Sequence, residues 1–240
     1  MTAVLELNGV SRVHGSGHLR VDALVGANLR VEAGTLVAVM GPSGSGKTTL
    51  LSLAGGLERP SSGEVLVEGR SLAQLDTSEL AKLRRRKIGY VFQQYNLIEG
   101  LTAVENVSLP LELDGVGRRQ ANRSAMRALE LMGLAELASR FPEQLSGGEQ
   151  QRTAIARAVV GDRVLLLADE PTGALDTVTG EGVLRLMRGH GEAGGAGVLV
   201  THDARFAAWA DRVVFLSDGR IVDETEGPQG PESLLGRITT

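Results

Sequence analysis

The sequence contains no cysteine and no long hydrophobic run. Without cysteine, disulfide bonds and thiolate metal sites are excluded. No apolar stretch approaches the roughly 18 residues that a membrane-spanning helix requires. The first ten residues also lack the basic start and apolar run of a signal peptide. We therefore expect a cytoplasmic protein that reaches a membrane only through a partner.

The chain also lacks an excess of basic residues, because its formal net charge is −4. A nucleic-acid-binding protein normally has a basic balance or a basic face, so we expect no nucleic-acid partner. Glycine, by contrast, is abundant, with 32 residues in 240. This abundance indicates tight turns and places where the backbone approaches a ligand closely.

Short apolar segments alternate with helical segments, which predicts an α/β fold with a mainly parallel sheet. The predicted strands cover residues 4–10, 27–31, 35–40, 65–67, 88–92, 164–168 and 197–200. The predicted helices cover residues 46–56, 78–86, 147–160, 177–188 and 204–210, and a hairpin turns at Asp218–Gly219. Between Leu101 and Ser139 helical periodicity dominates, interrupted by Pro110 and by residues 115–117. This segment predicts a helical lobe inserted into the α/β core, and we expect a loosely packed tail from Gly227.

A glycine-rich segment after the strand 35–40 matches the pattern G-x-x-x-x-G-K-[ST]. Its residues are Gly41, Pro42, Ser43, Gly44, Ser45, Gly46, Lys47 and Thr48. Glycines let successive backbone N–H groups, here from Gly44 to Thr49, line an anion site, and the following helix adds the positive end of its dipole. We expect Lys47 to reach the outer phosphates of a nucleotide and the Thr48 hydroxyl to ligate Mg²⁺.

Two acids, Asp169 and Glu170, end the apolar strand 164–168. Ligands of open α/β sheets bind at the carboxyl ends of the strands. Beside a phosphate loop, Asp169 suits a role in holding Mg²⁺. Glu170 can orient or deprotonate an attacking water.

A second glycine-rich helix start follows in the segment LSGGEQQR, residues 145–152. Ser146 is a good N-cap, so this start offers a second anion-binding terminus. One chain needs only one such anion-binding helix start per nucleotide. A second one, far from the first along the chain, is explained if it contacts ATP that is bound to another copy of the chain.

LSGGEQQR resembles the signature motif of the ABC (ATP-binding cassette) ATPases, and other motifs of that family follow in the same order. Gln93, in YVFQQYNL, resembles the Q-loop glutamine, which contacts Mg²⁺ and water. Residues 173–176, Gly-Ala-Leu-Asp, resemble the D-loop, and His202, in LVTHD, resembles the switch histidine at the γ-phosphate. The resemblance implies a P-loop NTPase (RecA-like) core with an antiparallel β subdomain and an inserted α-helical subdomain. It also implies ATP and Mg²⁺ as ligands, a second copy of the cassette as partner, and a membrane permease docked near the Q-loop.

The resemblance assigns a role to each motif residue within one nucleotide-binding domain, 1–240. The core with its β subdomain would cover about 1–92 and 160–225, the helical subdomain with the signature helix 93–159, and the tail 226–240. The residues expected to act in catalysis are Glu170, His202, Lys47 and Gln93. Those expected to hold Mg²⁺ are Thr48, Gln93 and Asp169. Beyond the phosphate loop, those expected to contact ATP are His14, Asp176 and, from the opposite copy, Ser146, Gly147 and Gly148.

Within the family, LTAVENVSLPLEL and ADEPTGALD resemble the ATPases of lipoprotein release and macrolide efflux. We therefore expect the ATPase subunit of an exporter, attached to the inner face of the cell membrane through its permease. The alternative is a cassette that drives a membrane protein mechanically or in regulation. A cassette of translation or DNA repair would carry a second cassette or a long coiled-coil insertion, and neither is present.

Three segments allow more than one interpretation. His14 occupies the position where the family has an aromatic residue that stacks on adenine, and imidazole stacks more weakly. His14 and His18 lie four residues apart, but no acid or cysteine completes a metal site with them. The basic run 84–87 is expected to be a solvated helix end rather than a contact with phospholipid. The apolar residues after the Q-loop, Leu97, Ile98 and Leu101, border either a docking groove or the core of the helical lobe.

Overall fold

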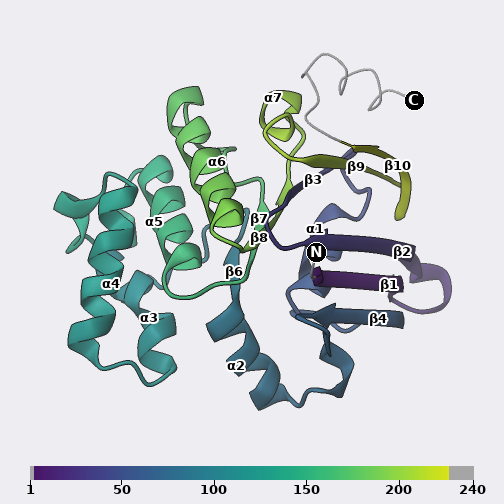
Figure 1. Ribbon diagram of the computed structural model, residues 1–240, viewed down its shortest axis with the longest axis horizontal. Helices are drawn as coiled ribbons and strands as arrows, with labels where there is room; N and C mark the ends of the chain where they lie inside the picture. The colour runs from purple at the N-terminus through teal and green to yellow at the C-terminus, as the bar shows by residue number, and fades with distance from the viewer. Residues whose placement is uncertain (1–2, 227–240) are drawn as a thin grey trace.

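A computed structural model describes residues 3–226 of the chain (Figure 1). The predicted tail from Gly227 onward lies outside these residues. These residues form two sheets and a group of helices, as the alternation of apolar and helical segments predicts.

The central sheet has six strands in the order β10-β9-β3-β8-β7-β6. The pairs β9–β3, β3–β8, β8–β7 and β7–β6 are parallel, and only β10 runs antiparallel to β9. Three inner strands are buried at every residue, because helices pack on one face of the sheet, and helices together with the antiparallel sheet cover the other. The strands are β3 (Leu36–Met40), β6 (Ile88–Val91), β7 (Leu165–Asp169), β8 (Ala196–Val200), β9 (Arg212–Ser217) and β10 (Arg220–Glu226).

The second sheet is antiparallel, with strand order β2-β1-β4-β5. Its strands are β1 (Ala3–His14), β2 (Val21–Glu32), β4 (Ser62–Val67) and β5 (Arg70–Ser71). β1 and β2 each have 12 residues, more than the predicted 4–10 and 27–31. Register shifts between Leu7 and Val10 and between Val10 and Arg12 break the alternation of apolar and polar residues, so the sequence pattern ends before the strands do.

Most of the helices that follow β6 gather on the side of the central sheet opposite the antiparallel sheet (Figure 1). α3, α4 and α5 pack on one another and form the inserted lobe, and α5 also packs on β6. The helices are α1 (Lys47–Ala54), α2 (Thr77–Lys87), α3 (Ala103–Leu113), α4 (Arg118–Leu131), α5 (Gly147–Val159), α6 (Thr177–Glu192) and α7 (Ala204–Ala207). The predicted α/β fold with an antiparallel β subdomain and a helical subdomain is confirmed.

One expectation about helices is wrong. α3 continues through Pro110 to Leu113 and is not broken there. Pro110 lies in the last turn of α3, where its missing N–H removes a single hydrogen bond near the helix end. The basic run 84–87 forms the end of α2, as predicted; Arg86 is exposed there, and Arg84, Arg85 and Lys87 are partly buried.

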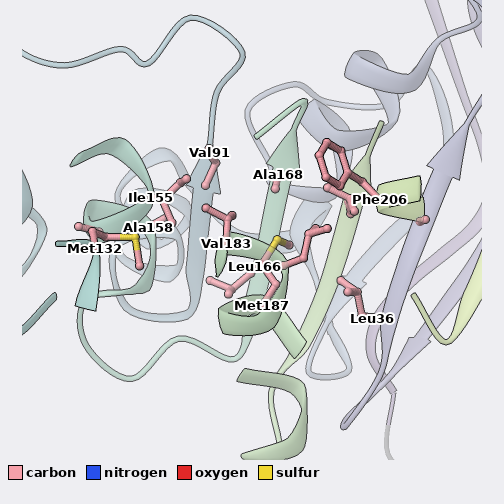
Figure 2. Close-up of a cluster of buried hydrophobic side chains, with 14 of the residues drawn as sticks. Leu36, Val91, Met132, Ile155, Ala158, Leu166, Ala168, Val183, Met187 and Phe206 are labelled. Atoms are coloured by element: carbon pink, nitrogen blue, oxygen red, sulfur yellow. The ribbon is translucent and has the colours of Figure 1, made fainter. Parts of the chain in front are cut away.

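Apolar side chains fill both faces of the central sheet. Alternate residues of β3 point to opposite faces, so Leu36, Ala38 and Met40 join one cluster while Val37 and Val39 join the other. Figure 2 shows the first cluster, in which side chains from β3, β6 and β7 pack against α5, α6 and Phe206. These cores hold the carboxyl ends of β3, β7 and β8 in fixed positions, and the candidate site lies there.

Candidate functional site

The glycine-rich loop 41–48 connects β3 to α1, and its conformation requires glycine. Gly41, Gly44 and Gly46 have φ angles of 153°, 79° and 102°. A Cβ on Gly41 would lie 2.0 Å from the Leu216 carbonyl oxygen, and one on Gly46 would lie 2.3 Å from the Ala23 carbonyl oxygen. The loop therefore packs against β9 and β2 through backbone contacts that leave no room for side chains.

A Gly46→Ala substitution tests this close packing. We expect it to weaken nucleotide binding by roughly tenfold or more, because the added methyl group displaces the loop from the Ala23 backbone. Gly69→Ala is the matched control, since Gly69 also has a positive φ of 73° but nothing within 4 Å of its Cβ position. Both variants carry a backbone strain of about 1 kcal/mol. Titration with a fluorescent ATP analogue should separate them, and equal affinities would contradict the packing argument.

The loop forms one wall of a cleft of about 830 Å³, a size that ligand sites commonly have. Many of the predicted site residues line it together, although they come from four separate segments of the chain. Those that line it are Gly41, Ser43, Gly44, Gly46, Lys47, Thr48, Thr49, Gln93, Asp169, Glu170 and His202. Pro42 and Ser45 belong to the loop but do not line the cleft.

Lys47 begins α1 and extends across its own loop. Its ammonium donates hydrogen bonds to the carbonyl oxygens of Gly41 at 2.8 Å and Pro42 at 2.7 Å. Burial lowers the pKa of Lys47, while the nearby Glu170 and Asp169 carboxylates act in the opposite direction. The Lys47 amine therefore lies at the phosphate loop, close to both carboxylates.

The Thr48 hydroxyl donates a hydrogen bond of 2.8 Å to the Asp169 carboxylate at the end of β7. Burial raises the pKa of Asp169, and the neighbouring Glu170 charge adds to this effect. The Gln93 side chain lines the same cleft. A hydroxyl, a carboxylate and an amide oxygen are hard ligands of the kind that Mg²⁺ prefers, so the donor set fits this ion.

Glu170 and His202 form a pair at the ends of β7 and β8. The Glu170 carboxylate accepts a hydrogen bond of 3.0 Å from the His202 backbone N–H and lies 2.8 Å from its Nδ1 atom. Glu170 has a φ of 48°, a left-handed conformation that is costly for a residue other than glycine. The Glu170 side chain is 16% exposed, whereas that of His202 is 76% exposed. The acid is therefore held in place, and the imidazole faces the open side of the cleft.

His14 does not line the cleft. It ends β1, pairs with Val21, and its Nε2 lies 3.8 Å from the Glu58 carboxylate. The cleft is also lined by residues for which the sequence predicted no role in a site: Val21, Asp22, Ala23, Asp218 and Gly219. Tyr95, two residues after Gln93, was also missed. Aspartate and glycine at 218–219 predicted only a turn, so the sequence held no signal that this turn reaches the site.

The second glycine-rich helix start lies outside the cleft. Ser146 is the N-cap of α5, as predicted, and forms a capping box in which the Glu149 carboxylate accepts a 2.7 Å hydrogen bond from the Ser146 N–H. Ser146 and Gly147 are exposed, and neither these two nor Gly148 lines the cleft. Asp176, the N-cap of α6, is exposed as well. Of the two glycine-rich helix starts, those of α1 and α5, only the start of α1 lines the cleft.

Comparison with known families decides between the many kinds of nucleotide-binding protein that share a phosphate loop. The family described as ABC transporter matches residues 24–173, which is more than half of the chain. This chain belongs to the ABC transporter family. Its ATP-binding, ATP-hydrolysing character, predicted from the motifs, is thereby confirmed.

Relatives of the cassette include single cassettes and fused proteins. An uncharacterised ABC transporter ATP-binding protein of Thermotoga maritima is 48% identical over 92% of this chain and 94% of that protein. The macrolide export ATP-binding/permease protein MacB of Neisseria gonorrhoeae is 42% identical over 98% of this chain, but the cassette spans only 37% of that protein's length. The predicted likeness to macrolide-export ATPases is confirmed.

Solved structures of a related cassette agree with the fold. The cassette MJ0796 of Methanocaldococcus jannaschii is 45% identical over 92% of this chain. Its dimeric structure in a post-hydrolysis state bound to ADP and Pi has a TM-score of 0.88 and covers 94% of this chain. Within residues 3–226, no helix combines the length and the apolar character needed to cross a bilayer.

Proposed function

We propose that the cassette powers export by a membrane permease, through closure of two cassettes around ATP. The observation that carries this proposal is the 42% identity with the ATP-binding part of MacB, whose name joins an ATP-binding unit to a permease for export. The chain would act at the inner face of the cell membrane through that partner. The division of 1–240 into one domain with a helical subdomain at 93–159 remains a prediction.

In this proposal the triphosphate lies along the loop 41–48. Backbone N–H groups from Gly44 to Thr49 hold its oxygens, and the Lys47 ammonium moves from the carbonyl oxygens of its own loop to the outer phosphates. Thr48, Gln93 and Asp169 would hold Mg²⁺, which supplies positive charge against the phosphates. Catalysis of this kind depends mainly on positioning and on charge stabilisation.

Glu170 and His202 are positioned to direct the attack on the γ-phosphate. One carboxylate oxygen of Glu170 is hydrogen-bonded to His202. The other oxygen of the same carboxylate can accept a proton from water. His202, exposed on the open side, is placed to contact the phosphate that leaves. The strained backbone of Glu170 supports this role, since strain concentrates at functional sites.

The second copy would complete the site with Ser146, Gly147 and Gly148, which do not line the cleft of their own chain. The exposed, capped start of α5 and the dimeric structures of the related cassette support this arrangement. Asp176, exposed at the start of α6, would lie near the other copy. ATP binding would then close the dimer, and hydrolysis would weaken it again.

The permease would dock beside the Q-loop. Ile98 is 46% exposed, and Leu97 and Leu101 are partly buried, which favours a docking surface over the core of the helical lobe. The buried Asn106 side chain keeps this segment rigid, because it accepts a 2.8 Å hydrogen bond from the Ile98 N–H and donates to the carbonyl oxygens of Ile98 and Leu101.

Reconstitution with the membrane subunit tests the proposal. We expect the membrane subunit to raise the ATPase rate of the cassette and ATP to drive a solute out of the cytoplasmic compartment of proteoliposomes. A membrane subunit that stimulates ATPase without moving any solute would favour the alternative, a mechanical or regulatory cassette. If no co-expressed membrane subunit changes the ATPase rate of the cassette, the result would contradict both the export function and the mechanical or regulatory alternative.

A further inference from the structure

Gln151 of α5 lines the ATP cleft of its own chain, although it takes no part in the mechanism proposed for the other cleft residues. Only 2% of the residue is exposed. Within residues 3–226 its Nε2 atom is buried without any hydrogen-bond partner. Burying an amide donor without an acceptor is unfavourable, so an apolar side chain of the same size would give a more stable helix here. The amide therefore indicates a function that needs a hydrogen-bond donor.

The packing of α5 shows at which level of the central sheet Gln151 lies. A Cβ on Gly89 of β6 would lie 2.1 Å from the Ala158 carbonyl oxygen, so the last part of α5 contacts the middle of β6. The start of α5 lies beyond the strand ends, where a Cβ on Gly148 would be 3.5 Å from the Ala174 carbonyl oxygen. α5 therefore runs antiparallel to β6 and β7.

The spacing along α5 brings Gln151 to the carboxyl ends of these strands. The seven helix positions from Ala158 back to Gln151 span about 10 Å, the length of about three strand residues. Three residues beyond Gly89 lead to the end of β6, directly before Gln93. The register between β6 and β7 puts the same level of β7 directly before Glu170.

The side of α5 that carries Gln151 faces the sheet. Ile155, one helical turn later, belongs to the same core cluster as Val91 of β6 and Ala168 of β7 (Figure 2). Residues four apart lie on one face of a helix, and helix side chains lean toward the helix start. One turn before Gln151 are the glycines 147 and 148, which have no side chains to fill the space. The Gln151 side chain therefore extends toward the strand ends.

Glu170 offers an acceptor on the same side of the cleft. Its Oε1 atom is already bound by the backbone N–H and the Nδ1 atom of His202. Its Oε2 atom has no hydrogen-bond partner among residues 3–226. No direct hydrogen bond joins Gln151 to Glu170 in this part of the chain. A water molecule, which both accepts and donates hydrogen bonds, fits between two such groups in a polar cleft.

The Gln151 amide can present its donor to the cleft. The oxygen and nitrogen atoms of an amide exchange places when the group makes a half-turn. A buried carbonyl oxygen without a partner is less unfavourable than a buried N–H without one. After the half-turn, the N–H groups of Gln151 face the cleft that the residue lines.

We propose that Gln151 is a further catalytic residue, which donates a hydrogen bond to the water that attacks ATP. The water accepts from the Gln151 N–H and donates to Oε2 of Glu170, so that its free lone pair points to the γ-phosphorus. Its oxygen forms the new bond to phosphorus, the bond to the ADP oxygen breaks, and the proton goes to Glu170. The N–H donor stabilises the negative charge that develops on the water oxygen as the proton leaves. The inference rests on the proposed role of Glu170.

Replacing Gln151 with methionine separates catalysis from stability, because methionine has a similar length but no amide. We expect kcat for ATP hydrolysis to fall roughly tenfold or more. The KM for ATP should change less than about twofold, since Gln151 lies outside the phosphate loop. The melting temperature should stay the same or rise, because an unpaired buried amide is removed. A purely structural role predicts the opposite pattern, a lower melting temperature with an unchanged kcat, and that pattern would overturn the inference.

Two other glutamines serve as controls. The Gln150 amide donates to the carbonyl oxygens of Pro142 and Leu145, at 3.0 Å each, so Gln150→Met should lower the melting temperature. Gln120→Met, at an exposed position on α4, should change neither kcat nor the melting temperature. If Gln151→Met does not fold, Gln151→Asn gives a second test. It keeps the amide but withdraws it by one methylene group, and it should lose kcat in the same way.

A double variant tests whether Gln151 and Glu170 act on the same water. Glu170→Gln combined with Gln151→Met should hydrolyse ATP no more slowly than Glu170→Gln alone. Losses that multiply would place Gln151 elsewhere in the mechanism and overturn the inference. A slow Glu170→Gln with a normal Gln151→Met would overturn the inference alone, whereas a normal Glu170→Gln would refute the proposed role of Glu170. The two failures are therefore distinguishable.

The ATP-bound structure of Glu170→Gln shows the contact directly. We expect a water within hydrogen-bond distance of both the Gln151 Nε2 atom and the side chain at position 170, in line with the γ-phosphorus. A water that is bound to Gln151 but lies out of reach of the γ-phosphorus would overturn the inference. So would an amide that contacts only protein atoms.

Discussion

Replacing Glu170 with glutamine should lower the rate of ATP hydrolysis by about 10²–10⁴-fold. Glutamine keeps the size of the side chain and its hydrogen bond to the His202 backbone, but it does not accept a proton from water. ATP binding depends on the loop 41–48 and should remain. The nucleotide therefore stays intact in the site, and the closed pair of cassettes should accumulate.

Light scattering after gel filtration measures this accumulation. With ATP and Mg²⁺, the Glu170→Gln variant should elute at twice the monomer mass. Without ATP, it should elute at a lower mass. Glu136→Gln, at an exposed position on the helical lobe, is the matched control and should hydrolyse ATP normally. Hydrolysis at the unmodified rate in Glu170→Gln would remove Glu170 from its proposed role.

Replacing Lys47 with alanine should abolish turnover, with a loss of about 10²–10³-fold or more. Among residues 3–226, Lys47 is the only basic side chain that lines the cleft, apart from the imidazole of His202. Without it, the negative charge of the phosphates faces the Asp169 and Glu170 carboxylates directly. Both the affinity for nucleotide and the rate of hydrolysis should therefore fall.

A phosphate-release assay and nucleotide titration measure these two losses. Lys82→Ala, on the exposed face of α2, provides a control for the loss of one positive charge and should leave both properties unchanged. The double variant Lys47→Ala with Glu170→Gln should show no ATP-dependent increase in mass. Retained ATPase activity in Lys47→Ala would show that the loop does not hold the phosphates as proposed.

Local patterns in the sequence predicted much of the central site. The loop 41–48 and the acids after 164–168 each combine a short motif with a buried strand, and only β8 separates these two parallel strands in the sheet. Ser146 could be recognised as an N-cap because capping depends on neighbouring residues. Motifs that depend on adjacent residues are visible before the fold is known.

Other features depend on contacts between distant segments, and the sequence did not reveal them. The turn at Asp218–Gly219 lines the cleft because it packs on β2, nearly 200 positions earlier in the chain. The length of β1 was underestimated because its register shifts interrupt the alternation of apolar residues.

The central claim is that each triphosphate is bound by helix starts from two different chains. The structure of the Glu170→Gln variant with ATP and Mg²⁺ tests it most directly. We predict a dimer in which Lys47 of one chain and Ser146, Gly147 and Gly148 of the other contact the same γ-phosphate. A nucleotide-loaded monomer, or a dimer in which residues 145–148 contact no phosphate, would contradict the account.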